Sequence, residues 1–137
     1  MALARLEAAG YGSLLVTQNV DRLHQRAGSQ RVIDLHGRLD RVICLSCGER
    51  TDRARMQERL IDYNHSLPSP GALAPDGDAD VPDDIINQIN VPPCESCGGV
   101  LKPDVVFFGD SVPRATVDEI FAAIDAAGAL LVIGSSL

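Results

Sequence analysis

The sequence predicts an α/β fold built on a parallel sheet, with a separate small module inserted into it. Two observations carry this prediction. Short aliphatic runs alternate along the chain with stretches whose apolar residues recur at helical spacing. Four cysteines in two closely spaced pairs then interrupt the alternation, together with a segment rich in Pro, Gly, Ser and Asp. With 45% hydrophobic residues, the chain can build a core.

Residues 1–40 contain two predicted helices and two predicted strands. The opening stretch MALARLEAAG is typical of a short amphipathic helix that ends at Gly10. Ser13–Thr17 and Arg31–Leu35 are short apolar runs typical of core strands. Between them we expect a helix with Asn19 at its N-cap and Gly28 at its end.

The next sixty residues contain the predicted module. Arg41–Leu45 reads as a strand that runs into the first cysteine pair. Thr51 is suited to cap a helix over the residues ARMQERLI. From about Asn64 to Asp84 the composition predicts a loop or an insertion.

The last part of the chain returns to the α/β pattern. Val100–Gly109 has strand character that we expect Pro103 to break. Four apolar residues at i, i+3, i+4 and i+7 then predict one helix face, which ends near Gly128: Val117, Ile120, Phe121 and Ile124. Ala129–Gly134 is typical of a buried parallel strand that leads into a turn of small residues.

Charge and hydropathy argue against two classes of partner. The formal net charge is −7, and no run of Lys or Arg occurs, so we expect no nucleic acid partner. No stretch reaches the ~18 apolar residues that a membrane helix needs, so we expect no membrane partner. The N-terminus does not resemble a secretory signal, which favours a reducing compartment.

The cysteine pairs have the spacing of metal ligands. They occur as C-L-S-C (Cys44, Cys47) and C-E-S-C-G-G (Cys94, Cys97), and two such turns can complete a tetrahedron of sulfurs. A zinc ion held by four sulfurs is structural because no position is left for water. The pairs lie further apart than the usual ~15–20 residues, which the insertion explains. Disulfides and a redox pair are the competing interpretations, and both are less favoured.

Five motifs in order identify a family resemblance. They are TQNVDRLH from Thr17, LHG from Leu35, the two cysteine pairs, LKPDVVFFGD and VIGSSL. Taken singly, each has a plain structural explanation; a histidine after a strand, for example, is more often a hydrogen-bonded structural residue. In this order, over essentially the whole chain, they closely resemble the sirtuin family of NAD-dependent protein deacylases. The sequence around the cysteines is most similar to that of class II sirtuins.

The resemblance implies a division of the chain into three parts. Residues 1–40 would be a Rossmann-like part with the nicotinamide pocket and the catalytic histidine. Residues 41–101 would be the small zinc-binding module with its insertion. Residues 102–137 would be a second Rossmann-like part with the peptide-groove strand and the Gly-Ser-Ser turn. The expected fold is therefore a partial Rossmann-like parallel sheet with an inserted zinc module.

The resemblance also implies residue roles. His36 would be the general base for the ribose hydroxyls of NAD, a task that suits imidazole because it titrates near neutral pH. Gln18 would contact the nicotinamide ribose, and Asn19 and Asp21 would line the nicotinamide pocket. The peptide edge would be Val106, Phe107, Phe108 and Gly109. The ribose and phosphates would lie on Gly134, Ser135 and Ser136. The single structural Zn²⁺ would be bound by Cys44, Cys47, Cys94 and Cys97.

The implied reaction transfers an acyl group from a lysine of a protein or peptide to the ADP-ribose of NAD⁺, with release of nicotinamide. NAD⁺ is then a co-substrate, and an acyl-lysine protein is the partner. Two alternatives stay open: an NAD-dependent ADP-ribosyltransferase with the same pocket, and a non-catalytic zinc-ribbon module that binds a partner. The implied location is the cytoplasm for a bacterial source and also the mitochondrial matrix for a eukaryotic one.

Two features of the family pattern do not occur in the sequence. No Gly-Ala-Gly phosphate loop precedes TQNVD, and nothing follows GSSL. We therefore expect the chain to be an incomplete piece that by itself binds NAD poorly and turns over little.

Overall fold

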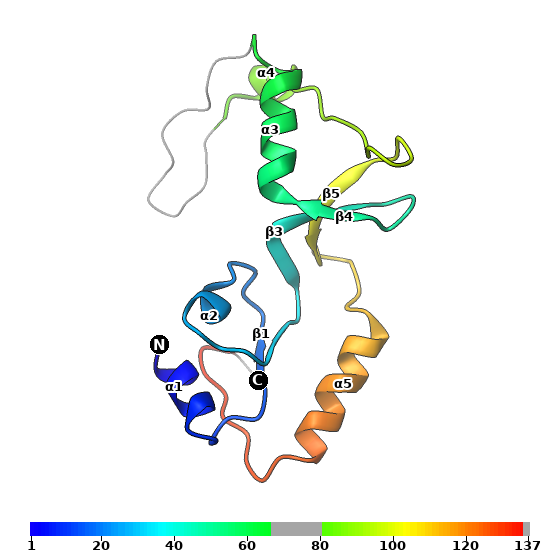
Figure 1. Cartoon of the computed structure of the whole chain (residues 1–137). Coiled ribbons are helices and arrows are strands. Elements are labelled where there is room, and N and C mark those ends of the chain that lie inside the picture. Colours follow the sequence, from blue (N-terminus) through cyan, green and yellow to red (C-terminus); the bar gives the residue numbers. More distant parts are fainter. Residues whose placement is uncertain (67–80, 136–137) are drawn as a thin grey trace. The chain divides into compact units, whose positions relative to one another are not determined.

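The computed structural model describes residues 1–66 and 81–135 (Figure 1). Most of the predicted insertion at 64–84 lies outside these residues, and so does Ser136 of the expected cofactor turn. The chain divides into two compact units, one formed by Met1–Leu39 with Asp104–Leu137 and one formed by Asp40–Pro103. No helix in the described part of the chain is long and apolar enough to cross a membrane.

A pair of parallel strands forms the centre of the first unit. β1 (Leu15–Thr17) pairs with β2 (Val32–Asp34), and Thr17 lies opposite Asp34. The pairing extends beyond both ends, because the Leu15 N–H donates to the Arg31 carbonyl at 2.9 Å and the Leu35 N–H to the Thr17 carbonyl at 2.8 Å. The predicted parallel pairing of these two runs is therefore confirmed.

Helix α1 (Ala2–Ala8) ends as predicted, with Gly10 at a φ of +81° that favours glycine. Its Glu7 carboxylate accepts hydrogen bonds from the backbone N–H groups of Gln30 at 3.0 Å and Arg31 at 2.8 Å. These bonds attach α1 to the start of β2, and they hold the pKa of Glu7 below its ordinary value.

Helix α2 (Leu23–Arg26) starts later than predicted, and Asn19 is not its cap. The Asn19 N–H donates instead to the Thr17 hydroxyl at 3.1 Å, which keeps that residue in the turn after β1. The Asp21 carboxylate accepts the Leu23 N–H at 2.9 Å and satisfies one of the free donors of the first helical turn. The helix ends before Gly28, which has a φ of +104°.

Helix α5 (Arg114–Asp125) confirms the predicted helix near the end of the chain. The predicted strand at Ala129–Gly134 is not formed, since the described residues there adopt no strand. Leu130 and Leu131 are 67% and 70% exposed. A strand needs a hydrogen-bonded neighbour, and the sheet of the described residues of this unit consists only of β1 and β2.

The second unit contains a three-stranded sheet in the order β4-β3-β5, whose strands are labelled in Figure 1. Its strands are β3 (Gly37–Cys44), β4 (Arg50–Asp52) and β5 (Leu101–Val105). β3 and β4 are antiparallel, with Val42 opposite Thr51, so Thr51 is a strand residue and not the predicted cap. Asp52 takes the N-cap position of α3 (Arg53–Tyr63).

Pro103 lies inside β5 and does not break it, contrary to our prediction. β5 is at the edge of the sheet, where one side of the strand makes no ladder bonds, so the missing N–H of proline is tolerated. The strand ends at Val105, earlier than predicted, and Val106–Gly109 follow it as an extended segment and a turn.

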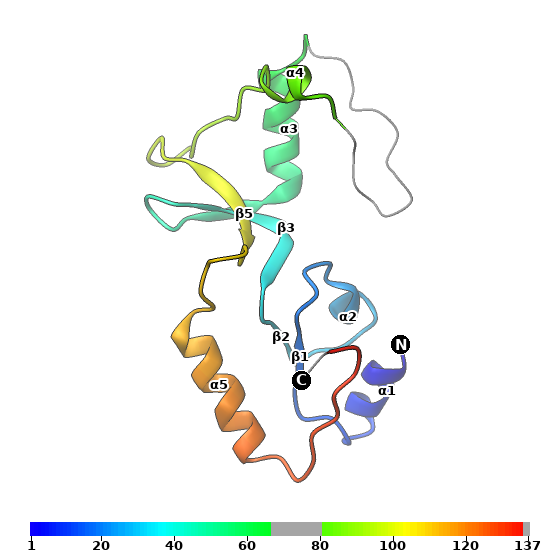
Figure 2. The same cartoon turned by 180° about the vertical axis from the view of Figure 1, so that it is seen from behind.

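A short helix, α4 (Asp83–Ile86), lies beside α3 in both views (Figures 1 and 2). The Asn64 side chain donates to the Asn90 carbonyl at 2.9 Å and accepts the Asn90 N–H at 2.7 Å, which joins the segments that follow the two helices. The buried apolar side chains of the described residues all belong to this unit: Val42, Cys44, Met56, Pro92 and Cys94.

Candidate functional site

The carboxyl ends of β1 and β2 bring several predicted site residues to one edge of the parallel pair. Gln18 and Asn19 follow β1, and His36 follows β2 after a single residue. The hydrogen bond from Leu35 to Thr17 keeps the two chains adjacent at this point. Ligands of parallel sheets bind at this edge. The backbone therefore places these residues at one edge of the parallel pair.

The backbone around His36 is fixed by its neighbours. His36 is half-buried, and its carbonyl accepts the Val106 N–H at 2.9 Å. Gly37 follows with a φ of +81°, and a Cβ at this position would lie 2.1 Å from the Asp104 carbonyl oxygen. Only glycine fits this turn, which explains the His-Gly pair of the sequence.

Asp34 holds the segment of α2 against the end of β2. Its carboxylate accepts hydrogen bonds from the Arg22 guanidinium and, at 2.9 Å, from the Gln25 amide. Arg22 has a φ of +64°, unusual for a residue with a side chain, and its ion pair with Asp34 is mostly shielded from solvent. The sequence analysis did not predict the contact between Asp34 and Arg22. The only signal for it in the sequence was a charged residue, Asp34, at the end of an otherwise apolar strand.

The other predicted residues of this unit are on its surface. Gln18, Asn19 and Asp21 are exposed, which leaves their side chains open to a ligand apart from the bond that Asp21 makes to Leu23. The predicted peptide edge begins at the half-buried Val106 and reaches the fully exposed Phe108. The Phe107 N–H donates to the Asp110 carboxylate at 3.3 Å. Gly134 and Ser135 are exposed.

The four cysteines of the second unit form one cluster, confirming that the two pairs meet. Their sulfurs all lie within 4.8 Å of one another, and no disulfide joins them. The Cys44 and Cys97 sulfurs are 3.6 Å apart, and those of Cys47 and Cys94 are 3.8 Å apart. A tetrahedral zinc with bonds of about 2.3 Å separates its sulfurs by roughly 3.8 Å, so the cluster fits this metal.

The two cysteine turns have the same backbone structure. The N–H of Gly48 donates to the Cys44 carbonyl at 3.0 Å, and that of Gly98 to the Cys94 carbonyl at 2.9 Å. Both glycines have a φ of +74°. The Leu45 N–H donates to the Val100 carbonyl at 2.9 Å, which links the two turns. The sulfurs are therefore brought together by backbone geometry.

The close approach of the four sulfurs and the nearby backbone N–H groups give the cysteine thiols different pKa values. Backbone N–H groups, first that of Cys47 and then that of Ser46, lower the pKa of Cys44 to about 6, against the opposing effect of burial. For Cys47, the Glu49 N–H is the largest single influence and lowers the pKa, but the sulfurs of Cys97 and Cys44 among others raise it to about 12. Four thiolates this close need a cation to be stable together.

Comparison with known proteins identifies the family. The model of the Sir2 family matches residues 1–137. The chain belongs to the Sir2 family. It is 58% identical over 137 residues to an NAD-dependent protein deacetylase of Xanthomonas axonopodis pv. citri, and 53% identical to the NAD-dependent protein deacetylase 2 of Bradyrhizobium diazoefficiens. These alignments cover 99% of this chain but 47% and 50% of the relatives, so the chain spans about half their length.

Solved structures agree with this family assignment. A complex of a Sir2 homologue with NAD is 34% identical and matches 91% of this chain and 38% of its own, with a TM-score of 0.61. A Sir2 structure with a p53 peptide and NAD⁺ is 29% identical and matches 88% of this chain and 39% of its own, with a TM-score of 0.62. The Sir2-family chain thus has the α/β fold with a parallel sheet and a cysteine cluster that its sequence predicts.

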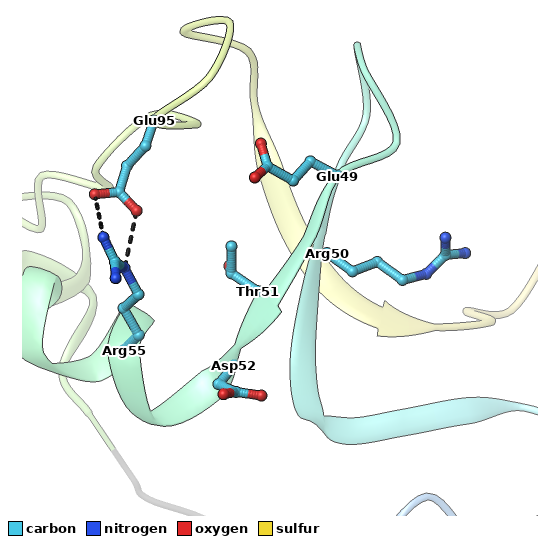
Figure 3. A pocket seen from close by; sticks show the side chains of 6 residues that line it. All are labelled: Glu49, Arg50, Thr51, Asp52, Arg55 and Glu95. Atoms are coloured by element: carbon cyan, nitrogen blue, oxygen red, sulfur yellow. Dashed lines mark hydrogen bonds and ion pairs between the residues drawn. The ribbon is translucent and has the colours of Figure 1, made fainter.

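The Sir2-family chain also has a charged depression beside its cysteine cluster, with a volume of about 460 Å³ (Figure 3). Glu49 and Glu95 lie on its rim, and Glu95 forms a two-bonded ion pair with Arg55. The Glu49 carboxylate is 3.7 Å from the Cys94 sulfur. None of the residues that line this depression was predicted as a site residue.

Proposed function

We propose that the protein that carries this chain is an NAD-dependent protein-lysine deacylase that acts on acetyl-lysine. The single observation that carries this proposal is the meeting of His36 with Gln18 and Asn19 at the carboxyl ends of β1 and β2. The family membership and the names of the relatives support the reaction type. Because those relatives are bacterial, we also propose a cytoplasmic location.

In this proposal, bound NAD⁺ supplies a sugar carbon that loses nicotinamide and accepts the acyl oxygen of the lysine amide. His36 accepts a proton from a ribose hydroxyl, so that this oxygen becomes a better nucleophile toward the acyl carbon. Gln18 orients the ribose, and Asp21 accepts a hydrogen bond from the carboxamide with its free carboxylate oxygen. Asn19 lines the same pocket. Gly37 and the hydrogen bond from Val106 fix the backbone of His36, which limits the region that its imidazole can reach.

The substrate peptide is proposed to lie along Val106–Gly109 as an added strand. Main-chain hydrogen bonds of this kind give affinity with little sequence preference, which suits an enzyme that reads only the modified lysine. Gly134, Ser135 and Ser136 are proposed to support the ribose and phosphates, where small side chains let the cofactor approach the backbone.

One structural zinc ion is proposed at Cys44, Cys47, Cys94 and Cys97. The sulfur spacing and the absence of disulfides support this site. A zinc with four sulfur ligands has no open position, so the metal stabilises the fold of the module and takes no part in proton transfer.

Replacement of His36 tests the catalytic proposal. In the complete protein, His36→Asn should lower the rate of NAD-dependent deacetylation of an acetylated peptide by about 10²–10⁴-fold, because the general base is lost. His65→Asn is the matched control, since His65 is an exposed histidine of the second unit whose ring is hydrogen-bonded to the Asp62 carbonyl. Circular dichroism checks that both variants fold. Full activity of His36→Asn would exclude His36 as the general base. Transfer of labelled ADP-ribose to protein by the complete protein, in place of deacetylation, would exclude the proposed deacetylase reaction.

A further inference from the structure

Two arginines of α3 reach the second cysteine pair. The Arg55 guanidinium donates from Nε and Nη2 to the two carboxylate oxygens of Glu95, at 3.0 and 2.9 Å (Figure 3). One turn later on the helix, Arg59 Nη2 donates to the Pro93 carbonyl at 2.6 Å. Pro93 and Glu95 are the residues on either side of Cys94, so α3 holds this ligand from both directions along the chain.

The two cysteine pairs differ in how the fold supports them. The N–H of each first cysteine donates at 2.9 Å, that of Cys44 to the Glu49 carbonyl and that of Cys94 to the Gly99 carbonyl. Only Cys44 ends a strand, because residues 89–93 before Cys94 adopt no helix or strand. On the N-terminal side of Cys94, the support comes from the buried Pro92 and from the contacts of α3.

The positive charge of Arg55 also offsets negative charge beside the cysteine cluster. Zinc with four thiolates carries a net charge of −2, and Glu49 and Glu95 add carboxylates beside it. The paired nitrogens of Arg55 offset the carboxylate of Glu95, which is only one residue from Cys94. Without Arg55, an unpaired carboxylate would remain next to an anionic centre.

We propose that Arg55 and Arg59 are positioning residues of the metal centre: from α3 they hold the second cysteine pair in place against the first and so slow the release of the metal. This inference rests on the proposed zinc site. The Arg55 and Glu95 side chains are 63% and 43% exposed, and exposed ion pairs contribute little to global stability. The expected effect is therefore on metal retention and not on the overall fold.

The experiment measures zinc in the purified protein and then its rate of release to a coloured chelator. Arg55→Gln and Arg59→Gln should each accelerate release by roughly two- to five-fold, as expected for the loss of an exposed charged contact. Arg114→Gln is the matched control, because it removes the exposed pair with Asp118 on α5, far along the chain from every cysteine. Release from Arg55→Gln and Arg59→Gln at the wild-type rate would overturn the inference.

Two further variants separate position from charge. Arg55→Lys keeps the charge but loses the planar fork that binds both oxygens of Glu95, so release should stay fast. Glu95→Gln removes a negative charge and should still accelerate release, because the two-bonded contact is lost. Slow release from both variants would mean that Arg55 acts through charge alone, which contradicts a positioning role. A wild-type protein without zinc would instead refute the metal site itself, so the two failures are distinguishable.

Discussion

At the scale of single residues, the turn after β2 is the most constrained point of the first unit. Gly37 turns the chain directly after His36, and the backbone of Asp104 and Val105 occupies the space that a Cβ at this position would need. Asp34 lies two residues before His36 and binds both Arg22 and Gln25. The proposed base His36 is therefore followed by Gly37, which fixes the turn of the backbone. It is preceded by Asp34, which binds the segment of α2.

Gly37→Ala should destabilise the protein by at least about 2 kcal/mol, because it adds a left-handed penalty and a steric overlap. The added Cβ would lie 2.1 Å from the Asp104 carbonyl oxygen. Gly10→Ala is the matched control, since Gly10 has the same φ of +81° with no atom near its Cβ position. Chemical denaturation measures both changes. Equal losses for the two variants would show that the contact with Asp104 does not matter.

Asp34→Asn should cost about 1–2 kcal/mol, because it weakens two hydrogen bonds, one of them to a charged and largely shielded guanidinium. The exposed Asp118→Asn on α5 serves as the control and should change stability little. Thermal unfolding compares the two. An Asp34 variant as stable as the wild type would exclude a supporting role for this carboxylate.

At the scale of elements, α1 is attached to β2 through one carboxylate. Glu7 accepts the N–H groups of Gln30 and Arg31, the two residues that lead into β2. This contact joins residues 23 and 24 positions apart in the sequence. It fixes where β2 begins, and the register of β2 in turn places His36.

The Glu7 contact predicts a pH dependence. Hydrogen bonds from the backbone of Arg31 and Gln30 lower the pKa of Glu7 from its ordinary value of 4.5. The ionised form is therefore favoured in the folded state, and its contribution is present above pH 4.5 and lost as the pH falls through the lowered pKa. Glu7→Gln should unfold at a lower temperature than the wild type at pH 7, and the difference should shrink below pH 4.5.

The control for this prediction is Glu119→Gln, an exposed position on α5. Unfolding temperatures of the three proteins across pH 3–7 test it by calorimetry. A difference between Glu7→Gln and the wild type that stays constant over this range would show that the carboxylate does not act through its charge.

At the scale of the whole molecule, the buried apolar core of the described residues and the metal ligands overlap. Of the five buried apolar side chains of the described residues, two are the proposed ligands Cys44 and Cys94, and all five belong to the unit Asp40–Pro103. We therefore expect a module with so small a core to depend on the proposed metal for folding. The other unit contains no proposed metal ligand.

Removal of the metal should therefore unfold one unit and leave the other. With a chelator and a reductant present, amide hydrogen exchange should become fast along β3 and β4, while the hydrogen-bonded amides of β1 and β2 stay protected. Mass spectrometry of peptides measures both regions. Unchanged protection at Val42 after complete loss of zinc would contradict the dependence on metal.

The sequence by itself predicted α1, α2, α3 and α5, most strands, the cysteine cluster and the family, because these follow from patterns within a few residues or from ordered motifs. It did not predict α4 or β4. Only the tertiary structure decided that Asp21 accepts the Leu23 N–H at the start of α2, that Pro103 stays within β5, and that Ala129–Gly134 remains outside a sheet. It also revealed the bonds of Glu7, Asp34 and Arg55. A side chain takes whichever partner the folded backbone brings within hydrogen-bonding distance, and partners 9 to 40 residues away leave no mark on the local pattern.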